Sequence, residues 1–424
     1  MIDKKFNSPE KLQELLEVVV DSKAAINQHH RQVLERRWNN FYELYRGIKS
    51  RKEYRGRADL DWASAYLAIE IIAPRLFQNI FPRQKWFGIN GRENTDKKQA
   101  SILEVYMRKI LDEPIHVRQK MISYLRYLCI YGTLICKTPF RHEEKKIPTK
   151  IRGAEGEIEI SDETIVYWDN LDLQLVDLYN FYPADDTIQR LEDQPFVIHA
   201  STETTKSLKR NEKSDDNPWG VYQNLDKIRF KDDKGQNITQ RPDNLRAQER
   251  MLGLGVTSRN FKHQGPIVYL DEFQGLIDIN GEERLMIVTV ANSNTVIQAE
   301  ELKTPDQEKT YIKGVYTDVP NEFWGMPPHE RSEKSIYELN DRVNQTMDAT
   351  SLMLNPVWLN SDADIPEGQL SVFPGRIIKT TTDKGLSPLR PDVSILSPAY
   401  NAIQSLITMI QDTTGSDRDW ETDN

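Results

Sequence analysis

The sequence is poor in cysteine and has no long apolar run, and both scarcities restrict what the protein can be. Its two cysteines, Cys129 and Cys136, lie in apolar surroundings, so we expect reduced core residues, with a disulfide between them as the alternative. No apolar stretch approaches the roughly 18 residues of a membrane-spanning helix, and the start of the chain lacks a signal peptide's apolar segment. We therefore expect a protein made in the cytoplasm, with no membrane partner.

An excess of basic residues is also missing, because the 424 residues carry a formal net charge of −9. Proteins that hold DNA tightly usually cluster Lys and Arg, since neutralising phosphates supplies most of their affinity. The charge argues against a repressor or a nucleic-acid packaging factor. It is compatible with a passage for DNA, because an acidic wall repels phosphate.

Motifs of the common catalytic chemistries are absent as well. No Gly-x-x-x-x-Gly-Lys-Ser/Thr run could cradle ATP phosphates, and His142-Glu143 and His329-Glu330 lack the second histidine of a metalloprotease. We expect no catalytic residue, no metal site and no cofactor, and a protein that is not an enzyme. A metal-dependent nuclease is the alternative, because four acids could hold magnesium: Asp185, Asp186, Asp271 and Glu272.

The first third of the chain has helical periodicity. Ser8-Pro9 predicts a helix start, and apolar residues recur at helical spacing from there to Gly47, before a charged loop over 49–61. Pro74 should kink or end the second run, and Gly132 should end the fourth. The second to fourth amphipathic runs cover about 62–80, 96–111 and the stretch from Pro114 to Gly132.

After Gly132 the period changes from helix to strand. A charged stretch over 141–163, with Gly153 and Gly156, predicts an exposed hairpin, and 205–265 predicts a variable surface excursion with some helix. Residues 1–325 are thus predicted to form an α+β body, with helices first and sheet later. The predicted strands lie at 134–136, 165–168, 173–178, 196–198, 267–270, 285–290, 295–298 and 311–317.

The last hundred residues predict a helix, a small β unit and a second helix. The first helix lies within 326–356, the β unit within 357–395 and the second helix within 396–415. A unit of under about 40 residues rarely buries enough apolar surface to fold alone. Either neighbouring copies cover it or it folds back onto the body of the same chain. The candidate subunit-contact residues are Ile336, Leu339, Val343, Met347, Trp358, Phe373, Ile403, Leu406 and Ile410.

Acidic residues lie mostly opposite the apolar stripe of the first helix. In a ring this face could point into a channel, and on a lone helix it would be an ordinary solvated face. The candidate channel-lining residues are Glu333, Glu338, Asp341 and Asp348.

Several local patterns, in this order, resemble the portal proteins of tailed bacteriophages, also called head-to-tail connectors, and most closely those of short-tailed phages. The resemblance covers most of residues 30–415. It rests on Tyr45-Arg46-Gly47, the helix, Tyr-Gly, strand junction over 125–137, the Asn180-Phe181-Tyr182-Pro183 turn, Phe323-Trp324-Gly325-Met326, Asn355-Pro356, Phe373-Pro374-Gly375-Arg376 and Thr414-Gly415.

The resemblance implies a ring-forming, non-enzymatic protein of the virion. Residues 1–325 would be the wing, 326–356 and 396–415 the two stem helices, and 357–395 the clip. A homo-oligomer of about twelve copies, assembled in the host cytoplasm, would form the channel at the portal vertex. Double-stranded DNA would pass through it during packaging and ejection. The large subunit of the packaging motor, the tail adaptor and the major capsid protein would be partners. A tail adaptor is a further alternative for the chain itself.

The end of the sequence departs from the family pattern. Family members continue after the second stem helix with a tunnel loop, a long kinked helix and often a crown. Residues 416–424 would therefore be the start of a tunnel loop or a truncated end. Either the sequence covers part of a longer protein, which we favour, or it is a shortened relative.

Overall fold

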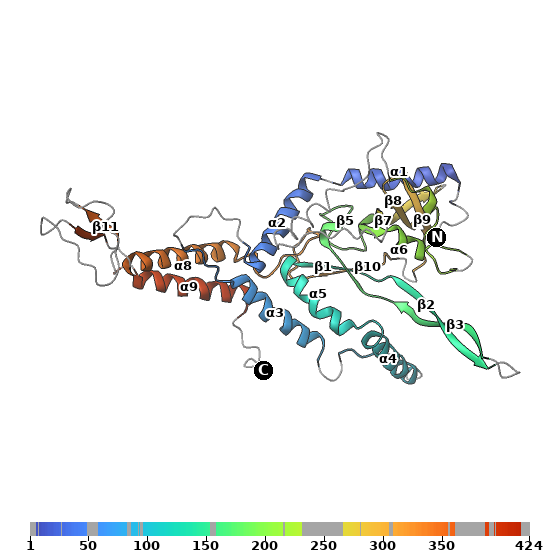
Figure 1. Ribbon diagram of the computed structural model, residues 1–424, viewed down its shortest axis with the longest axis horizontal. Coiled ribbons are helices and arrows are strands. Elements are labelled where there is room, and N and C mark those ends of the chain that lie inside the picture. The colour runs from blue at the N-terminus through green and yellow to red at the C-terminus, as the bar shows by residue number, and fades with distance from the viewer. Residues whose placement is uncertain are drawn as a thin grey trace. The chain divides into compact units, whose positions relative to one another are not determined.

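The computed structural model divides into two compact units. One comprises Met1–Tyr42 with Ile72–Pro327, and the other comprises Glu43–Ile71 with Pro328–Asn424 (Figure 1). The structure describes residues 6, 8–26, 28–48, 58–82, 86–91, 93, 96–152, 158–214, 217–230, 266–279, 281–304, 308–354, 357–360, 386–389, 394 and 396–416. The predicted body, 1–325, differs from the first unit at 43–71, which belongs to the second unit; of its described residues, Leu60, Trp62 and Ala65 contact α8.

The helical run predicted from Ser8-Pro9 to Gly47 is two helices. The Ser8 hydroxyl accepts the N–H of Lys11 at 3.4 Å and caps α1 (Pro9–Ala25). The backbone turns extended at Ile26, whose side chain joins the core, and α2 (Gln28–Arg46) follows. The prediction of one continuous helix is therefore wrong. The break at Ile26 keeps the apolar side chains buried, so the periodicity of apolar residues does not reveal it.

The next three helices match the predicted runs. They are α3 (Ser64–Ile80), α4 (Lys97–Asp112) and α5 (Val117–Tyr131). Pro74 lies inside α3 and does not end it. Proline removes one backbone donor there, but apolar packing continues on both sides of it: Ile72 and Ala73 are buried before it, and Leu76 and Phe77 are half-buried after it.

A five-stranded antiparallel sheet, in the order β5-β6-β7-β8-β9, forms the main core of the first unit. Its inner face packs against α1, where Leu15 and Val19 meet Phe273, Met286 and other buried side chains. The strands are β5 (Phe181–Pro183), β6 (Phe196–Thr204), β7 (Ile267–Ile279), β8 (Glu282–Ala291) and β9 (Thr295–Glu301).

Part of the predicted surface excursion packs on the same sheet. Leu208, Leu225 and Ile228 are buried against Leu270 and Ile297, so the helical part of this excursion is anchored to the sheet. The elements are α6 (Thr205–Arg210) and the short 3-10 helix η3 (Leu225–Lys227). Residues 231–265 lie outside the described residues.

A three-stranded sheet, β10-β1-β4, follows α5. Gly132 ends α5 at a φ of 78°, as the sequence predicted. The strands are β1 (Thr133–Lys137), β4 (Gln174–Val176) and β10 (Tyr311–Val315), and the 3-10 helix η2 (Leu178–Asn180) leads from β4 to β5.

The predicted hairpin is confirmed as a long two-stranded ribbon. It consists of β2 (Phe140–Arg152) and β3 (Ile158–Leu171), which pair antiparallel with a bulge between Glu143 and Glu144. In the described part of the chain, each of these strands pairs only with the other. At the base of the ribbon, His142 stacks on Trp219 at 4.5 Å between ring centroids.

The second unit is built on two helices. These are α8 (Glu333–Leu354) and α9 (Leu396–Thr414), and Gly415 has a φ of 68° directly after α9. Between them, β11 (Val357–Asn360) pairs antiparallel with β12 (Leu386–Leu389). Most of the predicted clip, including Phe373, lies outside the described residues.

Candidate functional site: the α8–α9 hairpin

One seam of α8 and α9 is covered by the chain itself. Leu339 and Val343 of α8 are buried with Ile403 and Ile410 of α9 and with Ala65 at the start of α3. Ile336 is also buried and Leu406 is half-buried there. These six residues of α8 and α9 were all predicted as subunit contacts, and in the structure they pack within one chain. Ala65 was not among the predicted residues. In the single chain, α9 and the start of α3 cover the apolar stripe of α8.

The other predicted contact residues have different positions. Met347 is 39% exposed on α8, so it is available to a neighbour. Trp358 lies on β11, where its backbone pairs with Pro388. Phe373 lies outside the described residues.

A second face of α8 holds an extended segment, residues 58–62, which we call the strap. The backbone N–H groups of Ala58, Leu60 and Trp62 donate to side-chain oxygens of α8, at 2.6, 2.6 and 2.9 Å. The acceptors form what we call the polar row: Asp348, Asn344 and Asn340 in the same order.

The spacing of the polar row explains how it holds an extended chain. Residues four apart on a helix rise about 6 Å, and residues two apart on a strand advance about 6.6 Å. Each acceptor of the row therefore meets every second N–H of the strap. Asn344 also donates to the Leu60 carbonyl at 3.0 Å, and Asn340 donates to the Asp61 carboxylate at 2.8 Å.

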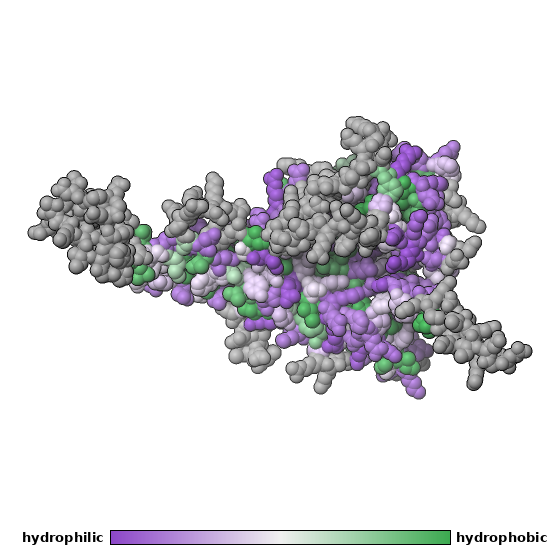
Figure 2. Space-filling view, viewed as in Figure 1, coloured by the Kyte–Doolittle hydropathy of each residue, from purple (hydrophilic) through white to green (hydrophobic). Residues whose placement is uncertain are grey.

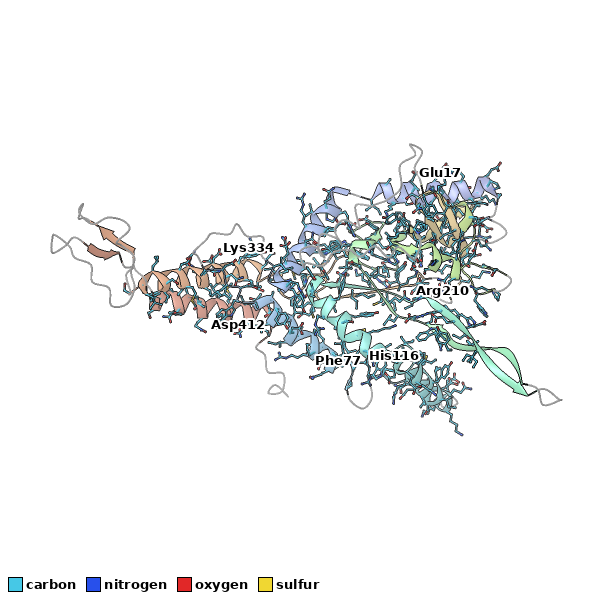
Figure 3. All side chains as sticks on the ribbon, viewed as in Figure 1. Glu17, Phe77, His116, Arg210, Lys334 and Asp412 are labelled. Atoms are coloured by element: carbon cyan, nitrogen blue, oxygen red, sulfur yellow. The ribbon has the colours of Figure 1, made fainter. Side chains whose placement is uncertain are left out.

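The third face of α8 is charged and solvent-exposed. Of the four predicted channel-lining residues, Glu338 and Asp341 lie on it, together with Lys334 and Arg342. Arg342 donates to Glu338 at 2.7 Å. Figure 3 labels Lys334 on α8 and Asp412 on α9 at the same end of the hairpin, as antiparallel helices require.

The other two predicted channel-lining residues do not lie on this exposed charged face. Asp348 accepts from the strap, and Glu333, like Asp348, is only partly exposed. The four acids do not share one open face. At 100° per residue Glu333 lies about 140° from Glu338 around the helix. Asp348 lies only about 20° from Asp341, but its carboxylate accepts from the strap. The exposed face carries two acids and two bases instead of an acidic stripe.

Apolar side chains remain uncovered on the second unit. They lie on the strap and the first turn of α3 as well as on both long helices, and Figure 2 shows hydrophobic residues scattered among polar ones along α8 and α9. They are Leu60, Trp62, Tyr66 and Leu67, Tyr337, Met347, Leu352 and Leu354, and Tyr400 and Met409.

Sequence reasoning missed the strap and the polar row. Asn340, Asn344 and Asp348 recur every four residues, which places amide and carboxylate groups on one helix face. That spacing was visible in the sequence. The identity of the segment it binds was not, because the strap lies about 280 residues away in the chain.

The four acids that a magnesium-dependent nuclease would use each bind a different partner within the chain. Asp185 accepts from the N–H and hydroxyl of Thr187, which lowers the pKa of Asp185, and Asp186 accepts from the Trp324 indole at 2.7 Å. Asp271 pairs with Lys23 at 2.9 Å. Within the described ranges, no three His, Cys, Asp or Glu side chains are grouped so that they could hold a metal ion.

Glu272 forms a buried polar centre between the two sheets of the first unit. It pairs with Lys137 of β1 and accepts from Tyr311 at 2.8 Å and from Gln274 at 2.9 Å. Burial opposes its ionisation, but Lys137, His199 and the hydrogen bond from Tyr311 hold the pKa of Glu272 below its usual value. Burial also lowers the pKa of His199, opposite Glu272, to about 4.

Substituting Asn344 tests the polar row. Asn344→Ala should lower the free energy of unfolding by about 1–3 kcal/mol, because it leaves the N–H and carbonyl of Leu60 without this partner. Urea unfolding and limited proteolysis at the strap would measure the change. The matched control is Gln345→Ala, at the next, exposed position, which should change stability by less than about 0.5 kcal/mol. Equal effects of the two variants would contradict this role.

Comparisons with models of known protein families and with curated proteins find no match for this chain. Among the described residues, no helix combines the length and the apolar character that crossing a membrane requires.

Proposed function

We propose that the chain is a portal subunit of a tailed bacteriophage. Copies of it would form the oligomeric DNA channel at the head vertex of the virion, through which the genome is packaged and ejected. The packaging motor, the tail adaptor and the major capsid protein would bind this ring. The proposal starts from the sequence resemblance, and the second unit supports it with one observation.

That observation is the incomplete cover of the α8–α9 hairpin. The pair buries one seam and holds the strap, yet Tyr337, Met347, Leu354, Tyr400 and Met409 stay 39–76% exposed. These side chains are apolar surface that a neighbouring copy would remove from water. Two helices alone cannot cover each other on all sides, whereas copies arranged around an axis cover these outer faces.

The charged face of α8 is better suited to letting DNA slide past than to binding it tightly. Lys334 and Arg342 balance Glu338 and Asp341, so this face would not hold phosphates by net attraction. The ring would act passively: DNA slides past a hydrated wall of mixed charge while the motor does the work. This replaces the acidic wall expected from the sequence.

Two alternatives differ in what they predict. A metal-dependent nuclease would cleave DNA when magnesium is added, and a double change of Asp185 and Asp186 would abolish the cleavage. A tail adaptor would bind a preformed ring and would not form one itself.

Electron microscopy of the purified chain tests the proposal. We expect closed rings of about twelve copies. Changing Met347 and Met409 to Glu should abolish the rings and leave a folded chain, because it places carboxylates in the proposed contact.

The matched control is Gln345→Glu, which places a carboxylate on the exposed charged face of α8 and should leave rings intact. A wild-type chain that stays monomeric at high concentration would contradict the proposal.

A further inference from the structure

His142, at the base of the β2–β3 ribbon, lies between two carboxylates. Its Nδ1 is 2.8 Å from a carboxylate oxygen of Asp169, and its Nε2 is 2.9 Å from one of Glu144. The strand pairing explains this arrangement, because Asp169 is the cross-strand partner of His142 and Glu144 lies two residues further along β2. The His142 side chain is 9% exposed, so little of the ring is in contact with water.

This arrangement is satisfied only by the protonated ring. A neutral imidazole has one N–H, so it can donate to one of the two carboxylates and turns a lone pair toward the other. An imidazolium has an N–H on each nitrogen and donates to both. The two carboxylates accordingly raise the pKa of His142 above its usual value, with the hydrogen bond to Glu144 as the largest cause and that to Asp169 next.

The neighbouring charged groups of the ribbon base are paired with one another. Arg141 forms ion pairs with Glu143 and Asp172. The segment that packs against the His142 ring, residues 217–222, contains no Asp, Glu, Lys, Arg or His. The protonation of the ring therefore depends mainly on the two carboxylates that contact it.

The same ring connects the ribbon to another part of the first unit. It stacks on the Trp219 indole, with 4.5 Å between ring centroids and 28° between the planes. A cation on an indole face is attracted by the ring quadrupole, and a neutral ring lacks this term. The segment that carries Trp219 is held tightly: the Val221 N–H donates to the Asn211 carbonyl at 2.9 Å, and a Cβ on Gly220 would lie 2.4 Å from the Glu212 carbonyl oxygen. A change at this contact should therefore move the ribbon.

We infer that protonation of His142 docks the base of the β2–β3 ribbon on Trp219 and that deprotonation releases it. In the neutral ring one lone pair would face a carboxylate, and the cationic part of the stacking attraction would be lost. Because the pKa of His142 is raised in the folded chain, the contact is fully stabilising below the usual pKa of about 6.5, and this stabilisation is lost as pH rises through the folded value. The inference concerns this contact alone and does not depend on the proposed function.

Hydroxyl-radical labelling of the intact chain, read by mass spectrometry, tests the inference. The labelling rate of Trp219 reports its exposure, and Trp324, which is 6% exposed, provides the internal reference. Trp219 is 57% exposed when docked, so release can raise its labelling by less than twofold. We expect an increase of about 1.5-fold between about pH 5 and pH 9, the range in which a histidine with a raised pKa loses its proton.

Variants show whether His142 causes this increase. In His142→Gln the labelling of Trp219 should not change with pH. The matched control is His30→Gln, which removes another histidine that pairs with an acid, Asp186 at 2.8 Å, and should keep the wild-type increase. Replacing both acids, Glu144→Gln with Asp169→Asn, should move the midpoint of the increase to lower pH, because neutral amides do not favour the cation.

Three results would overturn the inference. The first is a labelling of wild-type Trp219 that stays constant over this pH range. The second is an increase that persists in His142→Gln. The third is a midpoint that stays unchanged after both carboxylates are removed.

Discussion

Replacing Gly132 with alanine is expected to lower the free energy of unfolding by about 2–5 kcal/mol. Two costs add. The φ of 78° lies in the left-handed region, which costs an L side chain about 1–2 kcal/mol. A Cβ at this position would also lie 2.4 Å from the Gly325 carbonyl oxygen and 2.6 Å from the Pro327 nitrogen. Backbone atoms cannot move aside as a flexible side chain can, so overpacking costs a further 1–3 kcal/mol, roughly.

Gly281 provides the matched control for this prediction. It has a φ of 86°, but no atom lies within 4 Å of the Cβ that alanine would add. Gly281→Ala should therefore cost only the backbone strain, about 1–2 kcal/mol. Chemical denaturation of both variants measures the difference. Similar losses at the two positions would show that the close approach to Gly325 is not important for stability.

Replacing Lys137 with methionine is expected to cost about 3–5 kcal/mol at neutral pH. The change keeps most of the side-chain volume but leaves the buried carboxylate of Glu272 without its cation. Glu272→Gln should cost less, about 1–2 kcal/mol, because Lys137 is partly exposed and can reach water. The double variant Lys137→Met/Glu272→Gln should be more stable than Lys137→Met alone. A double-mutant cycle of unfolding free energies measures this coupling.

The pH dependence of the free energy of unfolding shows whether the ionised Glu272 carboxylate stabilises or destabilises the fold. In the wild-type protein the pKa of Glu272 is lowered on folding, so its ionised form stabilises the fold above its unfolded pKa, and this contribution is lost as pH falls through the folded value. In Lys137→Met the ionised carboxylate is the destabilising form. The stability gap between wild type and variant should therefore shrink on acidification. A gap that widens at low pH would contradict this account.

The Gly132 contact joins two motifs that stand far apart in the chain. Tyr131-Gly132-Thr133 and Phe323-Trp324-Gly325-Met326 entered the resemblance as separate patterns. In the structure the Thr133 hydroxyl accepts the Gly325 N–H at 2.7 Å, and a Cβ on Gly325 would lie 2.5 Å from the Gly132 carbonyl oxygen. The two glycines therefore permit one close approach of two backbones, which explains why both motifs contain glycine.

Local pattern was sufficient to predict most elements. The period of 3.6 predicted α8 and α9, Ser8 and Gly132 marked helix ends, and strand periodicity predicted the β2–β3 ribbon. These features depend on residues close together in the sequence, so the sequence by itself determined them. It also determined the apolar stripe of α8, though not what covers it.

Only the tertiary structure decided which surfaces remain open. The stripe of α8 is covered by α9, Asp348 is bound by a strap from near residue 60, and Leu208 lies under a strand formed some 60 residues later. Ile102, Val105 and Tyr106 of α4 stay exposed, although all three side chains are largely apolar. Burial depends on which distant segments meet, and periodicity within one helix carries no information about its partner.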